Sequence, residues 1–158
     1  TKVNTIPKGA RSRLWMGPSD LKEYTISADV RGSRMTDQLP DIGLTAHGYV
    51  LDLMGQSQQL QIRSWSAQLR MAETVDFSWQ EDKWYRMKFR VDLDSAPPAT
   101  VAILRGKIWP LDEDEPEEWT VTARDESPNL NSSPGLYGNA KVAELYLDNI
   151  EVVANSDD

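Results

Sequence analysis

The chain has 158 residues, with 25 acidic side chains against 17 basic ones and a net charge of −8. That length suits one domain with one hydrophobic core. The acidic balance argues against nucleic-acid binding, which needs a basic surface, and no apolar run reaches the ~18 residues of a membrane span. There are no cysteines, so disulfides, thiol catalysis and cysteine metal sites are excluded.

Apolar and polar residues alternate along most of the chain, with the period of two that is typical of β-strands. Residues 24–31 are predicted to form a half-buried strand, and residues 42–53 a central strand or a tight strand pair broken near Gly48. Further strands are predicted at 58–67, 68–79, 84–92, 100–109, 118–125 and 143–154. Connectors rich in Pro, Gly, Ser, Asn and Asp separate them, and no convincing helix pattern is present. This predicts an all-β protein, a two-sheet antiparallel β-sandwich with a jelly-roll topology.

Three parts of the chain are distinguished by their regularity. Residues 1–20 are irregular and are predicted to form an N-terminal arm or a partial strand, whereas residues 21–154 form the jelly-roll domain. Residues 155–158 are expected to be a frayed tail. No signal peptide is visible at Thr1, so we expect the sequence to be a fragment of a longer chain.

The segment 84–92 places a tryptophan and several cations on one side of a strand in an acidic protein. Trp84 is followed at alternate positions by Arg86, Lys88 and Arg90, while apolar residues occupy the other side. In other predicted strands, the apolar residues define the side that faces the core. The opposite side of those strands carries similar polar and aromatic residues. If these strands are neighbours in one sheet, the candidate ligand-binding residues are Gln61, Arg63, Trp65, Trp84, Arg86, Lys88, Arg105, Lys107 and Trp109.

Sugar recognition uses that combination of side chains. Aromatic rings stack on the C–H faces of pyranoses, while guanidinium and amide groups hydrogen-bond hydroxyls or pair with carboxylate and sulfate groups. We therefore predict a glycan-binding face, with an acidic glycan as one option. Trp65 and Trp109 are the favoured ligand contacts, whereas Trp79 and Trp119 are interpreted as packing residues.

An ordinary solvated face is the alternative to a binding face. Its cations would pair across strands with acids such as Glu73, Asp76 or Asp92. In that case Trp84 would cover the edge of the sandwich as a structural residue.

Catalytic patterns are absent from the sequence. The run LDEDEPEEW places Glu113, Glu115 and Glu117 at alternate positions, but Pro116 and the lack of interleaved apolar residues indicate a solvated loop. A glycosidase needs two carboxyl groups held across one sugar ring. His47 is the only histidine, so a multi-histidine zinc site is impossible, and its place in a β-rich run favours a structural role. We predict a non-catalytic protein.

Three local patterns together resemble a known superfamily: DKWYRMKFRV, ILRGKIWPLDEDEPEEWTVTARD and GLYGNAKVAELYLDNIEV. They are similar to the concanavalin A-like lectin/glucanase superfamily of jelly rolls, which includes laminin-G-like and 3-keto-disaccharide hydrolase-like domains. The middle pattern resembles a module appended to some bacterial PQQ-type propeller proteins. The resemblance covers about residues 21–154. It implies an exported bacterial domain, extracellular or periplasmic, with sugar binding as the commonest role.

The resemblance also leaves choices open. An aspartate near the position of Asp148 binds structural calcium in glucanase relatives, so Asp148 is either a calcium ligand or a structural residue that satisfies backbone groups. No other cofactor is expected. The leading hypothesis is a carbohydrate-binding accessory domain whose partner is a glycan or polysaccharide. The alternatives are an interaction domain that packs on a neighbouring domain of its parent protein, and a glycosidase-like enzyme or remnant.

Overall fold

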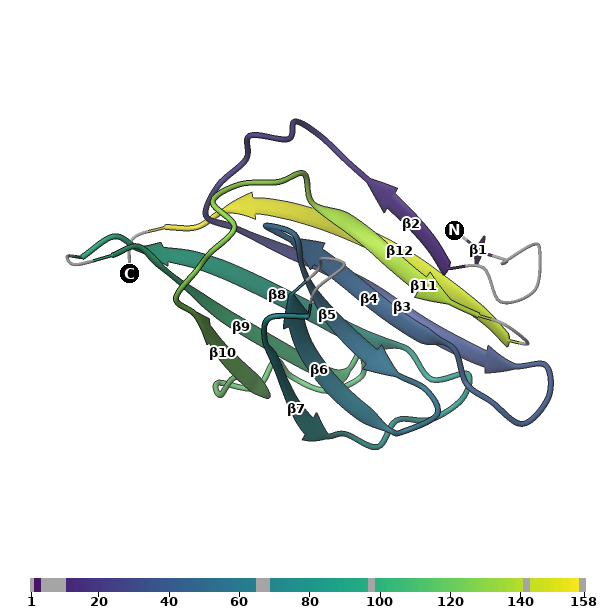
Figure 1. Ribbon diagram of the computed structural model, residues 1–158. Coiled ribbons are helices and arrows are strands. Elements are labelled where there is room, and N and C mark those ends of the chain that lie inside the picture. The colour runs from purple at the N-terminus through teal and green to yellow at the C-terminus, as the bar shows by residue number, and fades with distance from the viewer. Residues whose placement is uncertain (1, 4–10, 65–68, 97–98, 141–142, 157–158) are drawn as a thin grey trace.

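The computed structural model describes residues 2–3, 11–64, 69–96, 99–140 and 143–156 (Figure 1). All regular elements in these ranges are strands, and no described segment is a helix long and apolar enough to span a membrane. The strands are β1 (Lys2–Val3), β2 (Arg11–Trp15), β3 (Tyr24–Arg34), β4 (Asp41–Ala46), β5 (Tyr49–Met54), β6 (Gln59–Ser64), β7 (Ala72–Asp76), β8 (Tyr85–Asp94), β9 (Val101–Pro110), β10 (Val121–Asp125), β11 (Gly135–Asn139) and β12 (Ala143–Ala154).

The strands form two antiparallel sheets of six strands each, which stack face to face (Figure 1). Sheet A has the order β1-β12-β3-β8-β9-β10, and sheet B has the order β2-β11-β4-β5-β6-β7. Neighbours within a sheet are often distant in sequence, as when β12 pairs with β3. The predicted all-β, two-sheet jelly-roll sandwich is confirmed.

The predicted strand pair at residues 42–53 is the β4–β5 hairpin. His47 and Gly48 form its turn, with φ values of 51° and 72°. Two successive residues with positive φ are typical of the tight turns whose twist matches that of the flanking strands. Gly48 therefore breaks the apolar run into two central strands.

The inner faces of the two sheets form one hydrophobic core. Leu51 of β5 reaches across from sheet B to β9 of sheet A, where its side chain occupies the space that a Cβ atom on Gly106 would need. Trp79 closes one end of the core, where it is buried and donates from Nε1 to the Met54 carbonyl at 3.3 Å. The packing role predicted for Trp79 is confirmed.

Gly55 follows β5 at a close backbone approach. A Cβ atom there would overlap the carbonyl oxygens of Leu39 and Pro40, and backbone atoms cannot yield as a flexible side chain can. We expect Gly55→Ala to lower the free energy of unfolding by about 2 kcal/mol or more, the usual effect of overpacking. Urea denaturation measures the change, with Ser57→Ala in the same turn as the control. A loss below about 0.5 kcal/mol, the range of neutral surface changes, would contradict it.

The ends of the described chain belong to the sandwich. The predicted N-terminal arm contains β1, which pairs with β12, and β2, which pairs with β11. Asn155, the first residue of the predicted tail, donates its backbone N–H to the Glu23 carbonyl at 2.8 Å. Residues 157–158 lie outside the described residues.

Candidate functional site

The sequence-predicted ligand residues lie on two different sheets. Gln61 and Arg63 are on β6 in sheet B, whereas Lys88 of β8 and Lys107 of β9 are cross-strand partners in sheet A. The strands β8 and β9 are neighbours, as predicted. However, the candidate residues of sheet A and those of sheet B lie on opposite outer faces of the sandwich. Alternation separates the inside of a strand from its outside, and it says nothing about which sheet the strand joins.

On the outer face of sheet A, three of the arginines are paired with acids. Arg86 donates from Nη1 to Asp29 Oδ1 at 3.0 Å. Arg90 and Arg105 share Asp92, at 2.8 Å to its Oδ2 atom in each case. The Arg86–Asp29 and Arg105–Asp92 pairs join neighbouring strands, whereas Arg90 and Asp92 lie on the same strand. These bonds use much of the hydrogen-bonding capacity of the three arginines.

The acidic run after β9 folds back over the same face. Glu115 accepts from Lys88 at 2.6 Å and lies 2.7 Å from Lys107 Nζ. Partial burial tends to raise the pKa of Glu115, but the hydrogen bonds from the two lysines outweigh it and hold that pKa below its usual range. This carboxylate is therefore charged and engaged, unlike the general acid of a glycosidase.

The predicted tryptophan contacts on sheet A offer little surface. Trp109 is 9% exposed, which leaves little of its ring for stacking on a sugar. Trp84 precedes β8 and lies 5.4 Å from the Arg31 guanidinium, which also lies 4.3 Å from the Tyr146 ring. Trp65 lies outside the described residues.

The outer face of sheet B carries a different arrangement, which we call the Arg63 cluster: Thr45, Asp52, Arg63 and Tyr137. Arg63 of β6 donates from Nη2 to Asp52 Oδ2 on β5 at 2.9 Å. Its guanidinium also lies 5.4 Å from the ring of Tyr137 on β11. The four residues come from four adjacent strands, because β11, β4, β5 and β6 are neighbours in the sheet. Asp52 is only 4% exposed although its side chain points away from the core.

Two oxygen atoms of the Arg63 cluster lack partners. Asp52 Oδ1 and Thr45 Oγ1 are buried, and neither has a hydrogen-bond partner in the part of the chain that the structure describes. Burial raises the pKa of Asp52 to about 6, and the nearby Asp41 carboxylate adds to the effect while Arg63 opposes it. Unpaired buried polar atoms and shifted carboxyl groups are uncommon in structural positions and concentrate at functional sites.

Further polar side chains surround the cluster. Gln61 donates to Thr74 Oγ1 at 2.9 Å. On β2, burial lowers the pKa of Arg13, as does its proximity to Arg11 and Arg63, while Tyr137 opposes the shift. Three guanidinium groups therefore lie near one another in this acidic protein.

Sequence reasoning missed most of this cluster. Only Arg63 was a candidate, whereas Thr45 and Asp52 lie in the predicted central strands and Tyr137 on a strand that was not singled out. A signal was present: Asp52 interrupts the apolar run YVLDL, and a charged residue in such a run demands a partner or a function.

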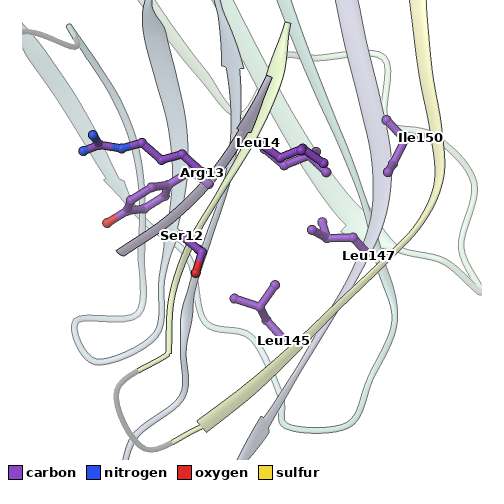
Figure 2. A pocket seen from close by; sticks show the side chains of 9 residues that line it. Ser12, Arg13, Leu14, Leu145, Leu147 and Ile150 are labelled. Atoms are coloured by element: carbon purple, nitrogen blue, oxygen red, sulfur yellow. The ribbon is translucent and has the colours of Figure 1, made fainter. Parts of the chain in front are cut away.

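A cavity of about 260 Å³ lies between the sheets at one edge of the sandwich (Figure 2). Leu14 of β2 faces Leu145, Leu147 and Ile150 of β12 across it. Ser12, Arg13 and Tyr137 also contribute to the lining, but most of its surface is apolar, so it lacks the converging polar groups that recognise a sugar. We assign it to incomplete packing at the sandwich edge.

His47 and Asp148 both have ordinary structural contacts. His47 is buried and its Nε2 accepts from the Glu23 N–H at 2.9 Å, while burial lowers its pKa and keeps the ring neutral. Asp148 accepts from the Asn149 N–H at 2.9 Å. Across the described ranges, no three acidic or histidine side chains gather as a metal site would require. Asp148 therefore belongs to no cluster of acidic side chains within those ranges, and calcium binding there stays a prediction.

Comparisons with known proteins define the class of fold. No family model and no curated protein matches this sequence. Among solved structures, a legume lectin-like domain from Entamoeba histolytica has a TM-score of 0.64 at 6% identity, covering 98% of this chain and 84% of that one. Sheep galectin-11, in a complex with glycerol, has a TM-score of 0.57 at 6% identity, covering 94% and 100%. The galectin LEC-6 from Caenorhabditis elegans has a TM-score of 0.57 at 7% identity, covering 96% and 95%.

At these identities the similarity concerns the fold alone. This chain has the concanavalin A-like jelly-roll fold of galectins and legume lectin-like domains. The fold resemblance inferred from the sequence is confirmed at this level.

Proposed function

We propose that this protein is a lectin-like, non-catalytic carbohydrate-binding domain whose glycan contacts the outer face of sheet B at the Arg63 cluster. The observation that carries the proposal is the pair of buried oxygens without partners among the described residues, Asp52 Oδ1 and Thr45 Oγ1. The other carboxylate oxygen of Asp52 accepts from the Arg63 guanidinium. The fold shared with galectins and a legume lectin-like domain supports the choice of ligand class, although function is argued from the site and not from the fold.

The chemistry of the cluster suits a sugar. A buried polar atom without a partner costs about 1–3 kcal/mol, and a glycan hydroxyl that reached Asp52 Oδ1 after a shift of the covering groups would remove that cost. Arg63 presents planar N–H donors to further hydroxyls or to an acidic substituent. Tyr137 is buried and the Arg63 side chain is 20% exposed, so water has limited access to such bonds. Trp65, which directly follows β6 in the sequence, stays a predicted stacking residue.

A glycan array with neutral and acidic glycans tests the proposal. We expect the wild type to bind and Arg63→Ala to weaken that binding by about tenfold or more, because a charge-assisted hydrogen bond contributes about 1.5–3 kcal/mol. Trp65→Ala tests the stacking prediction on the same array. Arg105→Ala is the matched control, since Arg105 pairs with Asp92 on the opposite sheet. Binding that survives Arg63→Ala but is lost in Arg105→Ala would place the site on sheet A and refute the proposal.

We also propose that the domain is an accessory part of a larger exported bacterial protein and that a neighbouring domain of that protein is a second partner. The three sequence patterns that resemble such modules support this proposal. Exposed apolar side chains on β2, where Leu14 and Trp15 are each 56% exposed, suit contact with another domain. Cell fractionation of the native protein tests it, and recovery in the cytoplasm alone would refute export.

A further inference from the structure

A groove of about 370 Å³ crosses the outer face of sheet A, on the side of the sandwich opposite the Arg63 cluster. Its floor consists of β3 and β8, one wall is the loop after β9, and the other wall is the end of β12. The lining residues are Thr25, Ser27, Lys88, Arg90, Glu115, Trp119, Glu151, Val153, Ala154, Asn155 and Ser156. We call it the sheet A groove. Its volume is near the lower end of small-molecule pockets, which span about 300–1,000 Å³.

The loop wall of the groove is held in place by several bonds. Glu115 joins Lys88 and Lys107 of adjacent strands, and Lys107 Nζ also donates to the Pro116 carbonyl at 2.8 Å. Lys107 lies 4.7 Å from the centroid of the Trp119 ring. The acidic run is therefore the fixed wall of a groove, and Trp119 is a positioned aromatic surface. The contact with Lys107 agrees with the sequence interpretation of Trp119 as a packing residue, and Trp119 also lines the groove.

The opposite wall is equally restrained. A bulge between Asp148 and Glu151 shifts the register of β12, and bulges re-aim the side chains that follow them. Glu151 thus faces outward opposite Ser27. Beyond the strand, Asn155 accepts from Thr25 Oγ1 at 2.7 Å and donates to the Val91 carbonyl at 2.9 Å. A groove with two pinned walls is preorganised, which lowers the entropic cost of binding.

The groove presents balanced charge and spare hydrogen-bonding capacity. Two cations and two carboxylates line it, which favours an uncharged ligand over a strongly acidic or basic one. Lys88 uses two of its three N–H donors on Glu115, which leaves one. The Glu151 side chain is 62% exposed, and among the described residues its carboxylate has a long contact of 3.5 Å with Arg86, so its oxygens can accept. Trp119 and Val153 supply apolar surface on opposite walls.

We propose that the sheet A groove is a second saccharide site, which takes one uncharged sugar ring of a hydroxyl-rich glycan. The C–H face of the ring contacts Trp119, and its hydroxyls bond to Glu151 and Lys88. This site goes beyond the function proposed for the Arg63 cluster, because it lies on the other sheet and uses other side chains. A domain with a sugar site on each outer face can connect two glycan chains, which raises the strength of attachment to a polysaccharide.

Amide correlation spectra of the labelled protein test the second site. The probes are maltose, cellobiose, lactose and diacetylchitobiose, added to millimolar concentration, with a hyaluronan disaccharide as the charged probe. We expect at least one neutral probe to shift the Trp119 indole N–H and the amides of Ser27 and Lys88. Glu151→Gln should weaken the affinity read from these signals about fivefold, the effect of losing a hydrogen bond worth about 1 kcal/mol. Trp119→Ala should abolish binding of the neutral probes to the groove.

The controls separate this proposal from the first one. Glu126→Gln changes an exposed carboxylate that does not line the groove and should leave the affinity unchanged. Because Glu151 is exposed, Glu151→Gln should fold normally. It therefore tests the proposal even if Trp119→Ala does not fold. Arg63→Ala should remove glycan binding at sheet B and leave the signals of the sheet A groove intact. The proposal is overturned if no neutral probe shifts these signals, if Glu151→Gln leaves the affinity unchanged, or if the charged probe binds the groove more tightly than the neutral ones.

Discussion

Asp52→Asn is expected to stabilise the protein at pH 7.5 by about 1–3 kcal/mol. Burial and the neighbouring Asp41 carboxylate raise the pKa of Asp52 from 3.8 to about 6 despite its bond to Arg63. A difference of this size corresponds to about 3 kcal/mol at most. The folded state therefore disfavours the charged carboxylate at neutral pH, and an uncharged asparagine of the same shape removes that cost.

The stabilising effect of Asp52→Asn should depend on pH. The folded protein binds the Asp52 proton more tightly than the unfolded chain does, so the contribution of Asp52 to stability is fully present below pH 3.8 and is lost as the pH rises through about 6. The advantage of Asp52→Asn should thus be small at pH 4 and complete above pH 6. Urea denaturation at pH 4 and pH 7.5 measures it, with the exposed Asp114→Asn as the control. A variant less stable than the wild type at pH 7.5 would show that the Arg63 ion pair outweighs the burial.

The same substitution should cost function. The asparagine side chain would still offer one oxygen, but it would carry no charge to strengthen a hydrogen bond from a sugar hydroxyl, and charge-assisted bonds are about twice as strong as neutral ones. We therefore expect weaker glycan binding on the array together with higher stability. Opposite changes of stability and binding are typical of residues that are kept for function at a cost to the fold.

Leu51→Ala is expected to lower the free energy of unfolding by about 2–5 kcal/mol, the range measured for buried leucines. Leu51 is fully buried in β5, and its side chain fills the space above Gly106 in the opposite sheet. Because glycine offers no side chain that could move into the vacated volume, the site is poorly able to collapse. The loss should therefore lie toward the upper end of that range.

Thermal and urea denaturation followed by tryptophan fluorescence measure the effect of Leu51→Ala. The matched control is Leu130→Ala, since Leu130 is 50% exposed in a connection between strands and its truncation should change stability by about 0.5 kcal/mol or less. Equal losses in the two variants would show that Leu51 does not join the two sheets as the structure indicates.

Much of the local structure was predictable from the residues themselves. The alternation in residues 84–92 correctly placed Met87 and Phe89 in the core and Lys88 outside. The apolar run at 42–53 with its break near Gly48 correctly indicated a pair of central strands. These features depend on the side-chain period of a strand and on the backbone freedom of one turn, and both are local properties of the sequence.

The candidate site was predicted only in part. Arg63 was correctly singled out as a polar side chain on an outer face, but its assignment to the same face as Lys88 was wrong, because β6 belongs to sheet B and β8 to sheet A. Asp52 was missed, since a single acid in an apolar run has no periodic signal of its own. Its raised pKa arises from neighbours on other strands.

The sequence by itself determined that this protein is an all-β sandwich and which residues of regular strands such as 84–92 face its core. It also excluded cysteine chemistry and a multi-histidine metal site. The tertiary structure alone decided which strands share a sheet, and so which polar side chains meet. It paired Arg86, Arg90 and Arg105 with acids, brought Asp52 beside Arg63, and built the sheet A groove from four distant segments. The physical reason is that alternation is a property of one strand, whereas strand order depends on contacts between residues far apart in the chain.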